Sequence, residues 1–132
     1  MSGNTNIKGS TNFNQLPNGY LSNGYLNKNG EPDVRYVTDI AEEIAQKLAP
    51  MKKHIFGQMY DKIQHVAAPL APLNGKQLEI NRLVPLAAHL VNKGKAPKIL
   101  LDFCKANANA VKSAADCTYF CYHMEAVYGY MR

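Results

Sequence analysis

The sequence predicts an all-α protein, a compact bundle of about five short helices preceded by a flexible arm rich in asparagine and glycine. Hydrophobic residues recur at intervals of three and four along most of the chain after residue 33. Prolines and glycines divide these stretches at spacings typical of short helices. Outside the first 33 residues there is no alternation of apolar and polar residues typical of a strand. We therefore expect one helical bundle domain over residues 34–132.

The first 33 residues hold five of the nine glycines and differ in composition from the rest. They contain a near-repeat, Asn-Gly-Tyr-Leu-Ser followed by Asn-Gly-Tyr-Leu-Asn, at residues 18–27. This stretch has no helical period and too little apolar surface to offset the entropy lost on ordering it. Asn-Gly pairs also favour hairpin turns, so a small hairpin is the alternative. We expect residues 1–33 to be a disordered or weakly ordered arm that folding does not require.

Each expected helix has a hydrophobic stripe and a recognisable boundary. The first follows Thr38, a good N-cap residue, and has an acidic first turn. The third contains Pro85, which should kink or restart it. The stripes consist, in chain order, of Ile40, Ile44 and Leu48; of Met51, Ile55, Met59, Ile63 and Val66; of Leu83, Leu86, Ala87, Leu90 and Val91; of Leu100, Phe103, Cys104 and Val111; and of Cys117, Phe120, Cys121, Met124, Val127, Tyr128 and Met131.

The excess positive charge lies in the middle of the chain. The formal net charge is +5, and residues 51–112 carry ten basic groups against three acidic ones. The flanking segments 1–33, 34–50 and 113–132 have net charges of 0, −1 and −1. A localised basic region is typical of a polyanion-binding protein, and a solvated lysine-rich surface explains it equally well.

Two of the expected helices begin with lysines. In Pro-Met-Lys-Lys at 50–53 and Lys-Ala-Pro-Lys at 95–98, a proline takes the expected first helical position with cations beside it. The positive end of the helix dipole favours anions, so lysine at that end slightly weakens the helix. A phosphate, in contrast, can bind the free N–H groups and the ammonium groups together. This pattern favours binding to a nucleic-acid backbone.

No base-reading motif of the zinc-finger, RRM or basic-zipper type occurs, and no helix-turn-helix can be located. Basic groups without such a motif predict contacts to the backbone, which are independent of sequence and sensitive to salt.

Cysteine and histidine residues do not form a convincing metal or catalytic site. Cys117 and Cys121 lie one helical turn apart, but His123 is about 200° around the helix from Cys121. Both cysteines fall on the apolar stripe, where free cysteine packs as a small hydrophobe. We expect no metal, no cofactor and no enzymatic activity. The other candidates, which are scattered along the sequence, are Cys104, His54, His65 and His89.

Three cysteines, all late in the chain, argue against a disulfide framework. No apolar run approaches the roughly 20 residues that a transmembrane helix needs, and Met-Ser-Gly-Asn does not open a signal peptide. We expect a cytoplasmic protein.

Three segments, in order along the chain, resemble the small subunit of type III-A CRISPR effector complexes, the Csm small subunit family. The first is residues 52–63, a basic start followed by a Phe and a Met-Tyr-Asp-Lys-Ile helix. The second is Leu-Val-Pro-Leu-Ala-Ala-His at 83–89, followed by Lys93. The third is residues 120–132, in which Glu125, Ala126, Val127 and Tyr130 match the family's carboxy-terminal helix.

The departures from that family are specific. His89 stands where an aromatic residue is usual, Gly129 where alanine is common, and Lys93 where arginine is usual. Lysine keeps the charge but loses the bidentate contact of arginine with phosphate.

The resemblance implies a five-helix protein that stacks in several copies along a ribonucleoprotein. Its partners would be guide RNA, target RNA, other CRISPR effector subunits and further copies of itself. It would line the groove where the two RNAs pair, bind their backbone without reading sequence, and have no active site. The alternative is a free-standing helical DNA-binding regulator or a protein–protein adaptor. The residues that the resemblance favours for RNA contact are Lys52, Lys53, Arg82, Lys93, Lys95 and Lys98, whereas Lys62, Lys105 and Lys112 are expected to be solvated.

Overall fold

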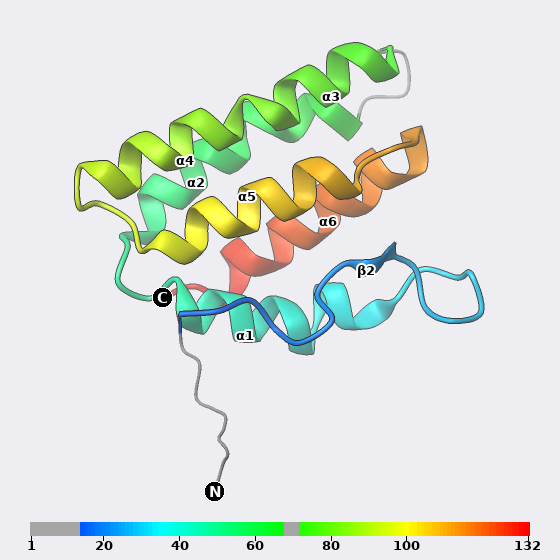
Figure 1. Cartoon of the computed structure of the whole chain (residues 1–132), viewed down its shortest axis with the longest axis horizontal. Helices are drawn as coiled ribbons and strands as arrows, with labels where there is room; N and C mark the ends of the chain where they lie inside the picture. Colours follow the sequence, from blue (N-terminus) through cyan, green and yellow to red (C-terminus); the bar gives the residue numbers. More distant parts are fainter. Residues whose placement is uncertain (1–13, 68–71) are drawn as a thin grey trace, which may run out of the picture.

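The computed structural model describes residues 14–67 and 72–132, and the all-α fold class predicted from the sequence is confirmed (Figure 1). The described residues form six α-helices, two 3₁₀-helices and one short strand. The elements are, in order, β2 (Ser22–Tyr25), η1 (Val34–Val37), α1 (Asp39–Lys47), α2 (Lys53–Ile63), η2 (Gln64–Ala67), α3 (Leu73–Asn81), α4 (Leu83–Asn92), α5 (Lys98–Ala110) and α6 (Ala114–Tyr130).

The last helix, α6, is the centre of the bundle, where it packs against α1, α2, η1 and η2. It begins at Ser113, whose Oγ accepts a hydrogen bond from the Asp116 N–H at 3.1 Å. The Asp116 carboxylate in turn accepts from the Lys112 N–H at 2.9 Å. The first bond satisfies one of the N–H groups that a helix start leaves free, and the second holds the residue before the N-cap against the first turn. The stripe predicted for this helix is buried at Cys117, Phe120, Cys121, Met124 and Val127.

The core contains buried phenylalanine side chains from three helices. Phe56 of α2, Phe103 of α5 and Phe120 of α6 are each at most 1% exposed. The rings of Phe56 and Phe103 have centroids 6.1 Å apart. In Figure 1, α4 and α5 lie antiparallel along one another, joined by a short turn at one end of the long axis. That arrangement brings the end of α4 and the start of α5 to one end of the bundle.

Residues 73–92 form two helices where the sequence predicted one. The sequence analysis missed α3, because its buried face consists of Lys76 and Ile80 and has no apolar stripe. α4 starts at Leu83, so Pro85 is its third residue. A proline in the first turn costs no hydrogen bond, because the N–H groups there have no partner within the helix. The break between α3 and α4 thus falls at Arg82, three residues before Pro85, and not at the proline where the sequence predicted a kink or restart.

The starts of three helices differ in detail from the prediction. Pro50 is not the first residue of α2, which begins at Lys53 with Lys52 as N-cap. Pro97 is the N-cap of α5, and Lys98 is its first residue. Thr38 is the N-cap of α1, as expected, but its hydroxyl donates to the Val34 carbonyl and caps no N–H of α1.

The prediction of a weakly ordered arm is wrong for residues 14–33, which we call the strap; residues 1–13 lie outside the described part of the chain. In Figure 1 the first part of the strap runs along α1, where Lys47 Nζ donates to the Gln15 carbonyl at 2.6 Å, and β2 lies against α6. Tyr25 is 2% exposed. The Tyr25 hydroxyl donates to Asn107 Oδ1 at 2.8 Å, and Asn107 Nδ2 donates to the Tyr20 hydroxyl at 2.9 Å. Aromatic residues at five-residue spacing thus anchor the strap in a polar pocket that only the folded bundle provides.

His123 completes this buried network. Its Nδ1 lies 2.6 Å from the Tyr36 carbonyl oxygen, which can only accept, so Nδ1 carries the proton. Nε2 is then an acceptor, and the Tyr20 hydroxyl donates to it at 2.5 Å. The Tyr36 hydroxyl accepts from the Leu21 N–H at 2.7 Å. These contacts tie the strap to α6 and to the start of the helical domain.

Candidate nucleic-acid interface

The start of α2 presents two lysines beside free main-chain N–H groups. Lys52 has an extended backbone at the N-cap, with no side-chain cap, and no acidic residue occupies the first turn. Lys53, the first helical residue, extends its ammonium over the Tyr128 ring, 5.0 Å from the ring centroid. This cation–π contact holds Lys53 half-buried, whereas Lys52 is exposed.

The start of α5 is similar. Pro97 makes no side-chain cap, and the first turn contains no acid. The Lys98 ammonium lies 3.5 Å from an Asp102 carboxylate oxygen, one turn further along the helix. Since the Lys98 side chain is 77% exposed, solvent screens its attraction to Asp102 and the ion pair is weak.

The turn between α4 and α5 brings two more lysines to the same end. Lys93 is the C-cap of α4, Gly94 has φ = 72°, and the N–H groups of Gly94 and Lys95 bond to the carbonyls of Val91 and Leu90. This is a Schellman cap, in which glycine adopts the left-handed conformation at low cost. Cations suit the negative end of a helix dipole, so Lys93 and Lys95 also help to end α4.

Figure 1 shows the starts of α2 and α5 and the α4–α5 turn at one end of the long axis. We call this end, with its five predicted residues, the lysine end. Arg82 is separate from it. The ten residues of α4 lie between Arg82 and Lys93, which puts them roughly 15 Å apart along the helix axis. The lysine end consists of Lys52, Lys53, Lys93, Lys95 and Lys98.

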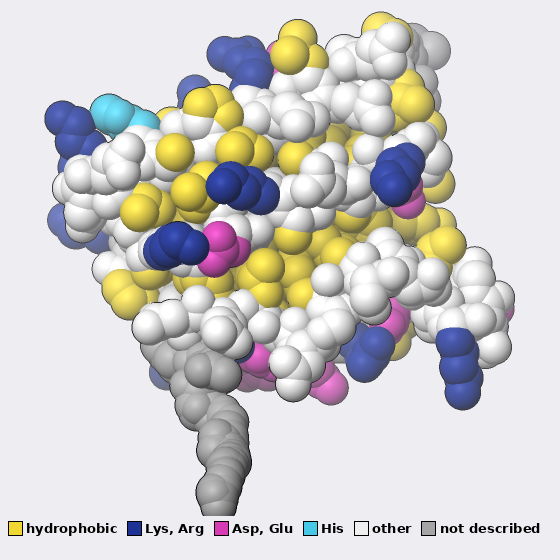
Figure 2. All heavy atoms as spheres, viewed as in Figure 1, with side chains coloured by type: hydrophobic (Ala, Val, Ile, Leu, Met, Phe, Trp, Pro, Cys, Tyr) yellow, Lys and Arg dark blue, Asp and Glu magenta, His cyan; other side chains and the backbone are white. Residues whose placement is uncertain are grey.

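Of the six residues predicted to contact RNA, three have an intramolecular partner and three have none among the described residues. Lys53 lies over Tyr128, Lys98 faces Asp102, and Arg82 lies 3.2 Å from Glu79. Within residues 14–67 and 72–132, the exposed side chains of Lys52, Lys93 and Lys95 form no ion pair or hydrogen bond. Figure 2 shows cationic side chains standing singly on the face it draws, with several at its left edge.

Sequence reasoning missed two histidines at the lysine end. His54 is the second residue of α2, next to Lys53, and His89 lies one turn before Lys93. Both side chains are exposed. An exposed imidazole can donate a hydrogen bond to a phosphate oxygen. Adjacency to the lysines in sequence was the signal that could have identified His54.

Cys104, Cys117 and His123 are buried, and burial favours the neutral form of each side chain. Burial raises the pKa of the Cys104 thiol to about 12 and also raises that of Cys117. Burial lowers the pKa of His123 to about 4, against a smaller opposing effect of the Tyr36 carbonyl. The described residues contain no group of three or more His, Cys, Asp or Glu side chains placed to hold a metal ion.

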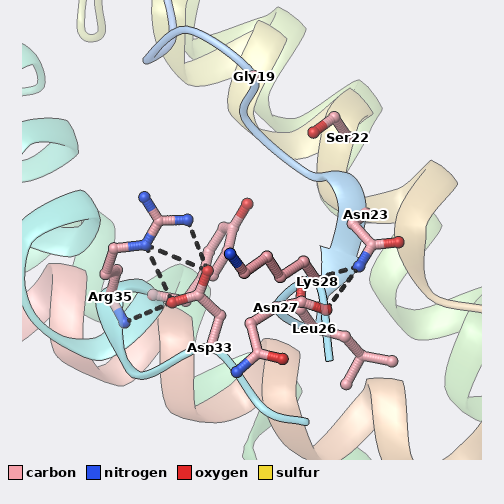
Figure 3. Close-up of a pocket in the computed structure, with 9 residues that line it drawn as sticks. Gly19, Ser22, Asn23, Leu26, Asn27, Lys28, Asp33 and Arg35 are labelled. Atoms are coloured by element: carbon pink, nitrogen blue, oxygen red, sulfur yellow. Dashed lines mark hydrogen bonds and ion pairs between the residues drawn. The ribbon is translucent and has the colours of Figure 1, made fainter. Parts of the chain in front are cut away.

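The strap and η1 line an open concavity of about 630 Å³ (Figure 3). Its polar groups are used within the protein. Asp33 accepts bonds from the Arg35 guanidinium at 2.7–3.2 Å, which lowers the pKa of the Asp33 carboxyl. The Asn23 amide donates to the carbonyls of Leu26 and Asn27. The concavity therefore presents loop-stabilising contacts rather than converging catalytic groups.

No protein-family model, curated protein or solved structure matches this chain.

None of the helices in the described part of the chain has the length and hydropathy needed to span a bilayer.

Proposed function

We propose that this chain is a non-catalytic RNA-binding structural subunit of a type III-A CRISPR ribonucleoprotein, acting in antiviral defence. The observation that carries the proposal is the lysine end, where Lys52, Lys93 and Lys95 have no intramolecular partner among the described residues (Figure 1). Their ammonium groups are available to phosphates without breaking an existing contact. The free N–H groups at the starts of α2 and α5 add donors to the same end.

The chemistry of this end favours backbone contact over base reading. Lysine is a flexible point charge, and the lysine end has no arginine or amide side chain among its five residues to fix a base edge by two hydrogen bonds. Binding is therefore expected to be independent of sequence and to weaken steeply with salt. Lys53 and Lys98 would also bind phosphate after giving up their weak contacts with Tyr128 and Asp102. Arg82, which lies away from the lysine end, would bind a different phosphate of a longer polyanion.

The CRISPR assignment rests on the three resembling segments, and two of them are in contact. The Tyr60 hydroxyl, in the first segment, donates to the Glu125 carboxylate in the third at 3.2 Å. Lys53 of the first segment lies over Tyr128 of the third. The resembling residues are thus neighbours in space as well as being in family order. We propose that several copies stack along the paired guide and target RNA with other effector subunits.

The test is RNA affinity measured across a salt series. The variant Lys52→Gln, Lys93→Gln, Lys95→Gln should flatten the slope of log affinity against log salt by up to about 2–3, since each phosphate contact contributes about 0.7–0.9. A control with the same change in charge is Lys62→Gln, Lys105→Gln, Lys112→Gln, which should leave the slope near that of the wild type. Melting curves for both variants check that the fold persists.

Equal slopes for the two triple variants, with both folded, would overturn the assignment of binding to the lysine end. A strong preference for one of two unrelated RNA sequences, or for duplex DNA, would favour the regulator instead. Co-purification from the native host should recover guide RNA and other effector subunits. Recovery of the protein alone, with no RNA, would contradict the CRISPR assignment. The salt series would still decide whether the lysine end binds RNA.

A further inference from the structure

The chain has four Asn-Gly pairs, at residues 18–19, 23–24, 29–30 and 74–75. In such a pair, the glycine nitrogen can attack the asparagine side-chain carbonyl, because glycine has no Cβ to obstruct the approach and has the widest choice of backbone angles. We propose that the folded chain is selectively deamidated at Asn18, and that this modification loosens the strap. The proposal does not depend on the RNA-binding function.

The pair at 23–24 is the ideal comparison, because both pairs read Asn-Gly-Tyr-Leu. In the folded chain, the Asn23 amide nitrogen donates to the Leu26 and Asn27 carbonyls at 3.2 and 2.9 Å. The Gly24 N–H donates to the Leu21 carbonyl at 3.0 Å. Both the leaving group and the attacking nitrogen are held in place, so this pair should react slowly.

The other two pairs are restrained in different ways. The Gly30 N–H donates to the Asn27 carbonyl at 3.0 Å, and Asn27 Oδ1 accepts from the N–H groups of Asn29 and Glu31, which fixes the loop. The pair at 74–75 lies in the first turn of α3, where the helical backbone fixes the side chain and the following nitrogen in a set geometry. Neither pair has the local freedom that ring closure requires.

The pair at 18–19 lacks these restraints. Asn18 and Gly19 are exposed, at the centre of a turn closed by the Tyr20 N–H donating to the Pro17 carbonyl at 3.0 Å. Among the described residues, neither the Gly19 N–H nor the Asn18 side-chain amide forms a hydrogen bond. The nucleophile and the leaving group are both available to solvent.

The reaction needs only water. The Gly19 nitrogen loses its proton to solvent and bonds to Cγ of Asn18; the Cγ–Nδ2 bond breaks, and ammonia leaves after taking up a proton. Water then opens the resulting five-membered imide at one of its two carbonyls. Opening at one carbonyl yields aspartate, and opening at the other yields isoaspartate, in which the main chain runs through the former side chain.

Either product disturbs the site where the strap is anchored. Residues 17–20 line a concavity of about 410 Å³ together with Arg35, Asp39 and Glu43, so a new carboxylate at position 18 adds a third negative charge where there is one cation. Isoaspartate also lengthens the main chain by one carbon just before Tyr20. The Tyr20 hydroxyl contacts both His123 and Asn107, and this lengthening should displace it. The modified strap should therefore be held less tightly than the original.

The experiment ages the full-length protein in mildly alkaline buffer and follows each Asn-Gly pair by peptide mapping with mass spectrometry, using fragment ions to separate positions 18 and 23. Enzymatic methylation of isoaspartate identifies the rearranged product. In the folded protein, position 18 should react several-fold faster than positions 23, 29 and 74. In denaturant, positions 18 and 23 should react at nearly equal rates, since the same residues, Gly-Tyr-Leu, follow both of them.

Comparable rates at 18 and 23 in the folded protein would overturn the selectivity. The variant Asn18→Gln should resist ageing, whereas the control Asn29→Gln should age as the wild type does. Aged wild type should melt at a lower temperature than fresh protein, and aged Asn18→Gln should not. An unchanged melting temperature in fully modified protein would overturn the effect on the strap.

Discussion

The Tyr20 hydroxyl donates a hydrogen bond to Nε2 of His123, over 2.5 Å and a separation of 103 residues in sequence. It joins the strap to α6, and the same hydroxyl accepts from Asn107 of α5. Folding of the bundle and ordering of the strap are therefore energetically coupled. Without the strap, neither His123 nor Asn107 has its full set of hydrogen-bond partners.

Removing residues 1–33 should destabilise the domain strongly. Truncation deletes Tyr20 and Tyr25 and leaves the buried atoms Asn107 Oδ1 and His123 Nε2 without bonding partners, although Asn107 Nδ2 keeps the Phe103 carbonyl and His123 Nδ1 keeps the Tyr36 carbonyl. Loss of one large buried aromatic side chain typically costs about 3–5 kcal/mol. Circular dichroism melting of the truncated chain should show a large fall in midpoint or no cooperative transition. A midpoint equal to that of the full chain would mean that the strap contributes no stability.

The substitution Tyr25→Phe should lower the free energy of unfolding by about 1–2 kcal/mol, because it leaves the buried Asn107 Oδ1 without its donor. The ring itself is retained, so packing is little changed. Tyr122→Phe is the matched control, since the Tyr122 side chain is 53% exposed. Urea unfolding of both variants measures the difference. Equal effects would assign no stability to the Tyr25–Asn107 hydrogen bond.

Stability should fall as the pH is lowered from about 6.5 toward 4. Burial lowers the pKa of folded His123 from 6.5 to about 4, so in this range the unfolded chain binds a proton that the folded chain does not. The unfolded state is then favoured, by up to about 3 kcal/mol for this group. Urea unfolding over a pH series measures the loss. An NMR titration that placed the folded His123 midpoint near 6.5 would contradict it.

Two helical glycines should respond to alanine in opposite directions. A Cβ on Gly57 would lie 2.9 Å from Cε1 of Tyr128, whose ring stacks on Phe56, so Gly57→Ala should destabilise. A Cβ on Gly129 would meet no atom within 4 Å, so Gly129→Ala should stabilise by about 0.5–1 kcal/mol through helix propensity alone. Thermal melts of the two variants provide the comparison, and a stabilised Gly57→Ala would show that the Tyr128 ring moves freely.

The helical class, five of the six helices and the buried stripe of α6 were predictable, because each of those helices has an apolar period and a boundary residue. α3 was not predictable, since Lys76 takes a place on its buried face, where a sequence pattern requires an apolar residue. The strap was missed for a related reason. Tyr20 and Tyr25 are too few to mark a buried segment, and the polar pocket that receives them exists only after distant helices have come together.

The candidate interface, too, was predictable only in part. The lysines at the starts of α2 and α5 were predicted from local charge alone, and the fold places those starts at one end (Figure 1). Which lysines have internal partners depends on contacts such as that of Lys53 with Tyr128, 75 positions apart, or on a rotamer choice such as that of Lys98. A sequence carries no signal for the former and only a weak one for the latter.

The central position of α6 has a consequence for synthesis of the chain. Residues 114–130 leave the ribosome after all the helices that pack against them, so Phe56 and Phe103 cannot be covered while the earlier helices are being made. The strap precedes every helix in the chain, and it must wait longest, because its partner His123 lies in α6, which is made after all the other described helices. Contacts so distant along the chain slow folding. During translation, the nascent chain would depend on chaperones or on rapid release to avoid aggregating through those exposed aromatic side chains.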